Sequence, residues 1–194
     1  MTIFIYPTDT VWGLGASIYD RKAQLRIAEI KGTDPHKPLS ILMPTLEDVK
    51  EYFNFPSTTN FDVLKKIFKS EATLGLPLSW IKKEIPTYIY SGSSWIGIRC
   101  VELVSLKTLS AKAQGPVTTT SLNYSGDKPI ITMDEALAFA KKFSECTFIP
   151  LHSEDPPMSG RPSCLMSFDD VGRYQMVRPG RFNKQLLDLA KQLF

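Results

Sequence analysis

Short apolar runs alternate with amphipathic segments along most of the chain, and this pattern predicts an α/β fold. Apolar or alternating runs bounded by turn residues predict the strands, which are Ile3–Tyr6, Leu39–Met43, Leu78–Ile81, Trp95–Arg99, Pro116–Thr120, Cys146–Leu151, Cys164–Phe168 and Tyr174–Val177. Segments with helical spacing lie between many of these strands. We therefore expect a mainly α/β sheet with helices packed against it.

Capping residues and apolar stripes mark the predicted helices. These helices are expected from Asp20 to Gly32, Thr45 to Phe53, Phe61 to Phe68, Leu103 to Ala113, Thr132 to Phe143, and from a cap at Asn183 towards the C-terminus. Gly32 is a typical residue just beyond a helix end. Lys31 is therefore expected on the last helical turn, with a loop over residues 32–38 after it.

Length and composition indicate an ordinary globular chain. A chain of 194 residues buries roughly 70% of its unfolded surface, so that it needs no disulfide or metal to fold. We expect one domain over residues 1–194, because no repeat or low-complexity linker interrupts the pattern. The 43% hydrophobic and 22% charged content excludes disordered and collagen-like architectures.

Charge and cysteine content narrow the functional classes further. The net charge of +3 is too small to indicate a nucleic-acid partner by itself, so that local clustering matters more. Three widely spaced cysteines and two histidines form no C-x-x-C pair or zinc pattern. No apolar run is long enough for a membrane span, and the first residues lack the features of a signal peptide. We expect a cytoplasmic protein with reduced thiols.

Three segments near predicted strand ends carry hydroxyl and lysine side chains. In residues 7–15, Thr8 and Thr10 precede a Gly-x-Gly pair, which fits either a flexible turn or a ligand pocket lined by backbone. In residues 31–39, Lys31 and Lys37 bracket a turn; they are either phosphate ligands or solvated surface lysines. Residues 118–126 are rich in Ser and Thr, which suits either a polar ligand or an exposed turn.

Arginines gather near the C-terminus. Residues 160–184 hold five basic and two acidic side chains, so that the local excess equals that of the whole chain. Arg178 follows a predicted strand, where its guanidinium could bind phosphate with two donors, and Arg99 ends another strand. Arg161, Arg173 and Arg181 fit either surface charges or a patch that faces tRNA, and we favour the surface.

The usual hydrolase and metal motifs are absent from the sequence. It contains no G-x-S-x-G elbow, no H-E-x-x-H pair, no EF-hand loop and no Walker A pattern. A covalent mechanism therefore has no obvious nucleophile. A site that works by positioning and electrostatics, as in phosphoryl and nucleotidyl transfer, fits these residues better.

Taken in order, these segments resemble the YrdC-type threonylcarbamoyl-AMP synthase family, which includes YrdC, YwlC and YciO-like domains. The motifs that carry the resemblance are Tyr6–Gly15, Lys31–Leu39, Leu74–Leu78, Gly97–Arg99, Thr120–Gly126, Pro162–Cys164 and Val177–Gly180. The resemblance implies a single-domain twisted mixed sheet with a concave basic cleft. It also implies an enzyme that joins L-threonine, bicarbonate and ATP into L-threonylcarbamoyl-AMP and releases pyrophosphate.

The resemblance also assigns roles to residues of this sequence. Catalytic groups that neutralise phosphate charge would be Lys31, Lys37 and Arg178. Threonine would be bound by Thr10, Arg99, Ser121 and Ser163, and the nucleotide by Thr8, Lys31, Thr33, Lys37, Asn123 and Arg178. Mg²⁺ would accompany ATP on its phosphates and on water, with no protein metal site and no tightly bound cofactor.

The family resemblance further implies partners and an alternative function. A threonylcarbamoyl transferase would pass the product to adenosine in tRNA, and tRNA or double-stranded RNA is a candidate direct partner. Thr33 occupies the place of a family arginine in the lysine loop, and Leu42 that of a frequent histidine. Thr33 favours the alternative, a YciO-like module that binds nucleotide or RNA with weak or no synthase activity. Related carbamoyl-adenylate chemistry, as in the hydrogenase-maturation domain, is a further alternative.

Overall fold

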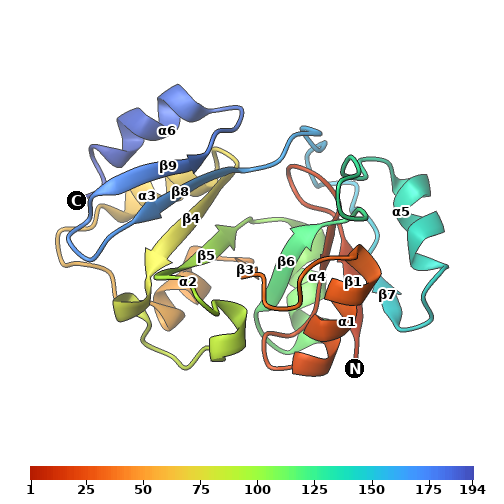
Figure 1. Cartoon of the computed structure of the whole chain (residues 1–194). Coiled ribbons are helices and arrows are strands. Elements are labelled where there is room, and N and C mark those ends of the chain that lie inside the picture. Colours follow the sequence, from red (N-terminus) through yellow and green to blue (C-terminus); the bar gives the residue numbers. More distant parts are fainter.

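A nine-stranded mixed sheet forms the centre of the protein in the computed structural model, which describes all 194 residues (Figure 1). The strand order is β7-β1-β2-β6-β3-β5-β4-β8-β9. The strands are β1 Ile3–Tyr6, β2 Gly13–Gly15, β3 Ser40–Met43, β4 Ala72–Pro77, β5 Trp95–Cys100, β6 Val117–Ser121, β7 Cys146–Phe148, β8 Cys164–Phe168 and β9 Tyr174–Arg178. The pairs β1–β7, β3–β5 and β4–β8 are parallel, and the other neighbours are antiparallel.

Six α-helices pack on this sheet. They are α1 Arg21–Lys31, α2 Leu46–Tyr52, α3 Phe61–Phe68, α4 Val104–Ala113, α5 Met133–Ala140 and α6 Asn183–Ala190. Short 3₁₀ turns cover Leu78–Trp80 and Thr87–Ile89. No helix has the length and apolar character needed to cross a membrane.

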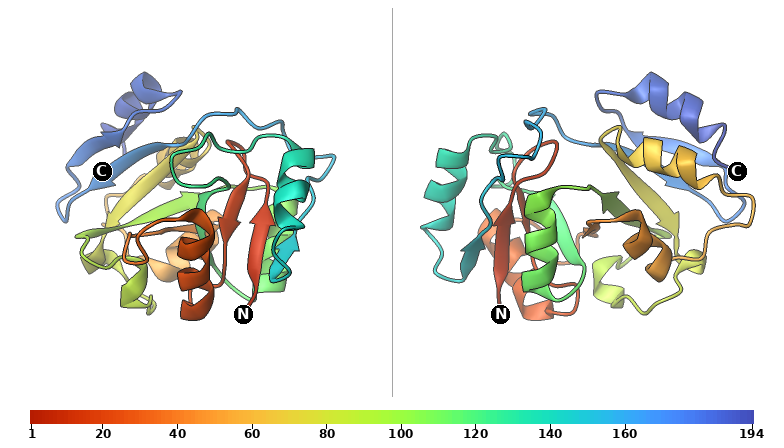
Figure 2. Two further views of the ribbon diagram at one scale, coloured as in Figure 1. Left: turned by 45° about the vertical axis from the view of Figure 1, so that its right-hand side comes forward. Right: turned by 180° about the vertical axis from the view of Figure 1, so that it is seen from behind.

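Strand β1 is buried on both of its faces, as its unbroken apolar sequence predicts. Its alternate residues Ile3 and Ile5 pack in a cluster with side chains of α1 and α5. Phe4 and Tyr6 point to the other face, where they pack with α4. Figure 2 shows α4 on one side of β1 and α1 on the other.

The largest apolar cluster lies in the other half of the sheet. It joins β4, β5 and β8 with α2, α3 and α6. Helices α3 and α6 lie side by side on this half, next to the blue strands β8 and β9 (Figure 2). Both halves of the sheet therefore have a packed apolar core.

Three of the predicted helix caps are confirmed. The side chain of Asp20 accepts a hydrogen bond from the Ala23 backbone at the start of α1, and Gly32 ends this helix with φ of 66°. Thr45 and Asp48 form a reciprocal capping box on α2. The Thr132 side chain caps α5. Lys31 accordingly lies on the last turn of α1.

The predicted strand Leu78–Ile81 is wrong. Leu78–Trp80 forms a 3₁₀ turn, and the strand β4 lies just before it, with all six of its residues buried. Residues 74–78 loosely resemble a Pro-Gly-Pro turn of the family, and no strand was predicted over them. Gly75 is instead a strand residue on which the Trp95 indole packs, since a Cβ there would lie 2.7 Å from the ring.

Strand β2 was expected to be a loop, because Gly13 and Gly15 are typical of turns. The two glycines permit close packing with neighbouring strands. A Cβ on Gly15 would lie 1.8 Å from the Thr118 carbonyl oxygen of β6, and one on Gly13 would lie 2.4 Å from the Tyr6 ring. The need for glycine at these two positions arises from tertiary contacts, which a local sequence pattern does not contain.

Several predicted boundaries also differ. Strand β7 ends at Phe148 instead of Leu151, and α5 ends at Ala140 instead of Phe143. Asn183 is the first residue of α6 and not its cap; its side chain accepts a hydrogen bond of 2.6 Å from the Gly180 backbone. The other elements agree with their predicted ranges to within one residue or two.

Candidate functional site

A cavity of about 560 Å³ lies between α1, the loop over residues 32–39 and the middle strands of the sheet. Nine of the ten predicted site residues line it: Thr8, Thr10, Lys31, Thr33, Lys37, Arg99, Ser121, Ser163 and Arg178. Four lining residues are basic, and Asp34 is the one acidic residue among them. Segments far apart in the sequence thus meet around one hollow that bears mainly positive charge.

Lys31 is held by the turn that follows β6. Its Nζ donates to the Ser121 carbonyl oxygen, and to the Asn123 carbonyl oxygen at 2.9 Å and Oδ1 at 3.0 Å. All three ammonium hydrogens therefore have acceptors. Burial, and after it the charge of Lys37, lower the pKa of Lys31 to about 8. Lys31 thus carries a fixed positive charge at neutral pH.

Asn123 is the one predicted site residue that does not line the cavity. Its Oδ1 accepts hydrogen bonds from Lys31 and from Ser121 Oγ, at 2.6 Å. Its Nδ2 donates to the carbonyl oxygens of Tyr124 and Asp127, both at 2.9 Å. In this arrangement Asn123 positions Lys31 and Ser121, and a direct contact with a nucleotide would require one of these hydrogen bonds to break.

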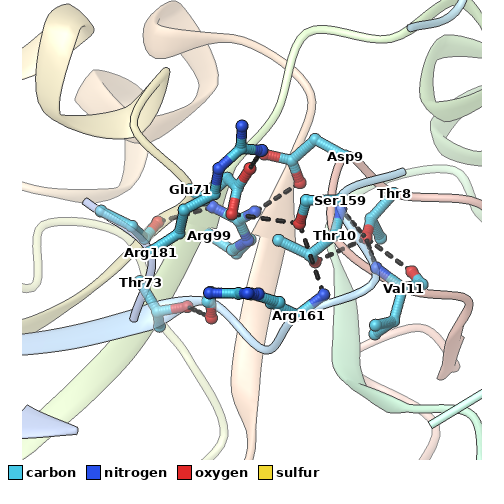
Figure 3. Close-up of polar contacts among 12 residues, drawn as sticks. Thr8, Asp9, Thr10, Val11, Glu71, Thr73, Arg99, Ser159, Arg161 and Arg181 are labelled. Atoms are coloured by element: carbon cyan, nitrogen blue, oxygen red, sulfur yellow. Dashed lines mark hydrogen bonds and ion pairs between the residues drawn. The ribbon is translucent and has the colours of Figure 1, made fainter. Parts of the chain in front are cut away.

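Thr8 and Thr10 form a compact turn after β1. Thr8 Oγ1 donates to the Val11 carbonyl oxygen at 2.6 Å, so the Thr10 hydroxyl is the donor in the 2.9 Å contact between the two side chains. Figure 3 shows these contacts beside Arg99. Thr10 Oγ1, which lines the cavity, therefore keeps acceptor capacity for a donor group of a ligand.

Arg99 lies deep in the site, with 4% of its surface exposed. Its Nη1 donates to the Ala72 carbonyl oxygen at 2.8 Å, and its Nη2 forms an ion pair with Asp9 Oδ1 (Figure 3). Two neighbours thus fix the guanidinium plane, and its remaining N–H groups can bind a planar anion such as a carboxylate.

Arg178 stands at the exposed rim, at the end of β9. It donates through Nε and Nη2 to the Ser163 carbonyl oxygen, at 3.1 and 2.9 Å, and through Nη2 to Ser163 Oγ at 3.2 Å. Ser163 Oγ also contacts Thr73 Oγ1 at 2.8 Å. The two donors of Nη1 make no bond to protein and remain for a ligand.

The lysine loop, residues 31–39, keeps Lys37 and Thr33 at the other side of the cavity. The Thr33 backbone donates to the Ala28 carbonyl oxygen, which completes the end of α1. Asp34 Oδ1 accepts from the His36 backbone at 2.8 Å and shapes the turn before Lys37. The Lys37 backbone donates to the Asp34 carbonyl oxygen at 3.1 Å, whereas its exposed side chain makes no hydrogen bond or ion pair within the protein.

The other arginines of the C-terminal segment lie outside the cavity lining. Arg173 pairs with Asp169 at 2.7 Å on the surface. Arg181 lies 3.5 Å from Glu71, whose carboxylate also accepts a hydrogen bond of 3.1 Å from Ser159 Oγ (Figure 3). Arg161 is exposed nearby. All three arginines are thus exposed, and the preference for plain surface charges over a patch that faces tRNA stays a prediction.

Sequence reasoning missed several residues of the site. Asp9, the partner of Arg99, lies between the two predicted threonines, within the motif Tyr6–Gly15. Thr73 and Trp95 line the cavity from β4 and the start of β5. The first was missed because β4 was not predicted, and the second because an aromatic residue at a strand start indicates packing more often than binding.

Sequence comparisons support a family relationship. The family model for Sua5, YciO and YrdC proteins, described as telomere recombination, matches residues 2–180. A threonylcarbamoyl-AMP synthase of Haemophilus influenzae is 25% identical over 182 residues, which cover 92% of each chain. A putative threonylcarbamoyl-AMP synthase of Methanocaldococcus jannaschii is 34% identical over 136 residues, which cover 69% of this chain and 60% of the relative.

Solved structures show the same fold. The crystal structure of P. abyssi Sua5 complexed with L-threonine matches with a TM-score of 0.78 and 22% identity, over 99% of this chain and 54% of that one. E. coli YciO matches with a TM-score of 0.72 and 21% identity, over 92% of this chain and 83% of that one. The chain thus spans about half the length of the P. abyssi protein.

Proposed function

Because the chain belongs to the Sua5/YciO/YrdC family, we propose that it is a synthase that makes L-threonylcarbamoyl-AMP from L-threonine, bicarbonate and ATP and releases pyrophosphate. The observation that carries this proposal is the shared cavity. Residues predicted to bind phosphate and residues predicted to bind threonine line the same hollow, with four cations around it. One site can therefore hold both reactants next to each other.

The proposed reaction has two steps. The threonine amine and bicarbonate form a carbamate, with loss of water and of one proton from the ammonium group. A carbamate oxygen then attacks the α-phosphorus of ATP, and the bond from that phosphorus to the bridging oxygen of the β-phosphate breaks. Pyrophosphate leaves with the electron pair of this bond. The protein forms no covalent intermediate, so its contribution is orientation and charge.

The cations are proposed to act on the phosphates. Lys37 and the free Nη1 donors of Arg178 bind phosphate oxygens directly, whereas Lys31, whose hydrogens have acceptors, stabilises developing charge from a fixed position. The hydroxyl and backbone groups of Thr8 and Thr33 border the nucleotide in this proposal. Asn123 keeps Lys31 in place.

Threonine is proposed to bind at the Arg99 end of the cavity. The buried guanidinium of Arg99 receives the carboxylate, with the hydroxyl groups of Ser121 and Ser163 beside it. Thr10 Oγ1, which has acceptor capacity, receives the N–H of the amino acid. This orientation leaves the nitrogen free to carry the carboxyl group that later attacks phosphorus.

Mg²⁺ would be held by the substrate more than by the protein. No group of three or more His, Cys, Asp or Glu side chains lies together, and Asp9 is already paired with Arg99. The donor set thus fits a cation that keeps its water and binds the phosphates of ATP. When bound there, Mg²⁺ would neutralise part of the triphosphate charge.

The product is a mixed anhydride that needs an acceptor. In the proposed function, a separate threonylcarbamoyl transferase passes the threonylcarbamoyl group to adenosine of tRNA in the cytoplasm. Direct binding of tRNA or double-stranded RNA by this chain is a further part of the proposal.

A coupled assay tests the synthase. The protein is incubated with ATP, bicarbonate and pyrophosphatase, and phosphate release is measured with L-threonine, with L-serine or with no amino acid. We expect release that depends on threonine, and a strong loss of it in Arg99→Met and Lys37→Met variants. Absence of this release, together with retention of RNA on a filter, would favour the YciO-like alternative, for which Thr33 in the lysine loop is the supporting feature.

A further inference from the structure

Trp95 is a half-buried tryptophan in the wall of the cavity, at the start of β5. The other two tryptophans are buried against aromatic partners. Trp12 stacks on Phe148 with ring centroids 5.1 Å apart, and Trp80 packs edge-on against Phe194. Trp95 makes no aromatic pair and no cation–π contact. Part of its π-surface therefore lacks a partner inside the protein.

Two glycines lie on the strands around this indole. Gly75 of β4 lies against the ring, and any side chain at that position would displace it, because a Cβ would come within 2.7 Å. Gly97, two residues further along β5, lines the cavity without a side chain. The ring is thus supported on one face by the Gly75 backbone, and the Ser40 side chain occupies the space at Gly97, with its Oγ 2.4 Å from where a Cβ would lie.

The same strand links this aromatic end to the Arg99 end of the cavity, where threonine is proposed to bind. Trp95, Gly97 and Arg99 alternate along β5, so that they share one face of the sheet, and the first and last lie about 13 Å apart along the strand. The lysine loop enters β3 next to this face, since Ser40 is opposite Gly97. A flat ligand group stacked on Trp95 would therefore lie beside the lysine loop and its cation Lys37.

We propose that Trp95 is the stacking platform for the base of the nucleotide. A nucleoside triphosphate has a flat aromatic group at one end and a polyanion at the other, and the cavity offers an unpartnered indole and a set of cations in the matching order. This inference rests on the proposed function, because it assigns the base of ATP to one end of the same site. Under this assignment, Trp95 determines the affinity of the cavity for the base of ATP and not for its phosphates.

Binding measurements on Trp95→Ala and Trp95→Phe test the assignment. The dissociation constants of ATP and of inorganic tripolyphosphate, which lacks a base, are measured by calorimetry without threonine. We expect Trp95→Ala to weaken ATP binding about 5- to 150-fold and to leave tripolyphosphate binding unchanged. Trp95→Phe keeps a ring and should lie between Trp95→Ala and the unchanged protein.

Fluorescence supplies the matched control. ATP should quench tryptophan emission in the unchanged protein and in Trp80→Phe, whose altered residue is buried away from the cavity. The quenching should be much weaker in Trp95→Phe, because Trp12, which also borders the cavity, is fully buried and stacked on Phe148. Equal ATP affinity in Trp95→Ala, or an equal loss for ATP and tripolyphosphate, would overturn the assignment. If ATP binds through Trp95 and no threonine-dependent pyrophosphate release occurs, the inference stands and the synthase proposal fails.

Discussion

Lys31 shows how a single side chain can be both buried and charged. Its three ammonium hydrogens meet two carbonyl oxygens and the Asn123 side chain, while 7% of its surface is exposed. The hydrogen bonds offset part of the cost of removing the ammonium group from water. Burial nevertheless lowers its pKa to about 8, with a further contribution from Lys37. Its charge is therefore sensitive to pH just above neutrality.

This pKa predicts how ATP binding depends on pH. Phosphate favours the protonated lysine, so bound ATP raises the pKa of Lys31 above its value in the free protein. The dissociation constant of ATP should be nearly constant below about pH 8 and should increase as the pH rises past that value. Lys31→Met should bind ATP about 10- to 100-fold more weakly at pH 7 and lose this dependence. A slope that persists in Lys31→Met would assign it to another group.

Thr33 is the residue at which this chain departs from its family in the lysine loop, and it lines the cavity. A charged contact with phosphate contributes about 1.5–3 kcal/mol, which corresponds to about ten- to a hundredfold in rate if it acts in the transition state. We expect Thr33→Arg to speed threonine-dependent pyrophosphate release by up to this factor. Thr33→Val, which adds no charge, is the control. An unchanged or slower rate in Thr33→Arg would mean that another basic side chain already fills the role.

At the scale of elements, helix α4 depends on a residue far away in the sequence. Its own N-cap, Leu103, provides no side-chain hydrogen bond. Asp155, in the linker between β7 and β8, accepts instead from the Val104 backbone at 2.7 Å and from the Ser105 backbone at 3.1 Å. The same linker donates from the Ser159 backbone to the Asp9 carbonyl oxygen at 3.0 Å. One connection thus caps a helix and borders the site.

Asp155→Ala should lower the free energy of unfolding by about 0.5–2 kcal/mol, the usual cost of a lost cap. Burial would raise the pKa of Asp155, but hydrogen bonds from Ser105, Val104 and His152 outweigh it and hold this pKa below its usual range. The stabilisation is therefore present above the pKa of the unfolded chain and is lost as the pH falls through the lower, folded value. Urea unfolding at several pH values, with Glu154→Ala as the control, measures this loss of unfolding free energy and its dependence on pH. A difference between Asp155→Ala and the unchanged protein that grows in acid would contradict the assignment.

At the scale of the whole molecule, the cavity takes its walls from both halves of the sheet. Lys31 and Ser121 come from the half that holds α1 and β6, and Arg178 comes from β9 at the far edge (Figure 1). Strands β3 and β5 connect these halves through continuous pairing. A ligand in the cavity would therefore stabilise both halves at once.

We propose accordingly that residues 1–194 unfold as one cooperative domain. Thermal unfolding should show a single transition by both calorimetry and circular dichroism. ATP at about 100 times its dissociation constant should stabilise the whole transition by about 2.7 kcal/mol. Two transitions, of which ATP shifts only one, would mean that the two halves are separate units.

The sequence by itself determined the elements whose signals are local. The apolar run Ile3–Tyr6, the Asp20 cap and the Thr45 cap each depend on residues a few positions apart, and the structure confirms all three. The ordered motifs also determined the family, because their residue types and order are properties of the sequence.

Only the tertiary structure decided which glycines belong to strands and which side chains hold others in place. In the sequence, Gly15 indicates a turn. In the structure it is a strand residue, and the Thr118 carbonyl oxygen of β6 lies 1.8 Å from where a Cβ of Gly15 would be. Asn123 is a candidate ligand in the sequence, but in the fold its amide is bound to Lys31 and Ser121. The contacts of Gly15 with Thr118 and of Asn123 with Lys31 join residues about 90 to 100 positions apart, and their energies depend on distances that a local pattern does not contain.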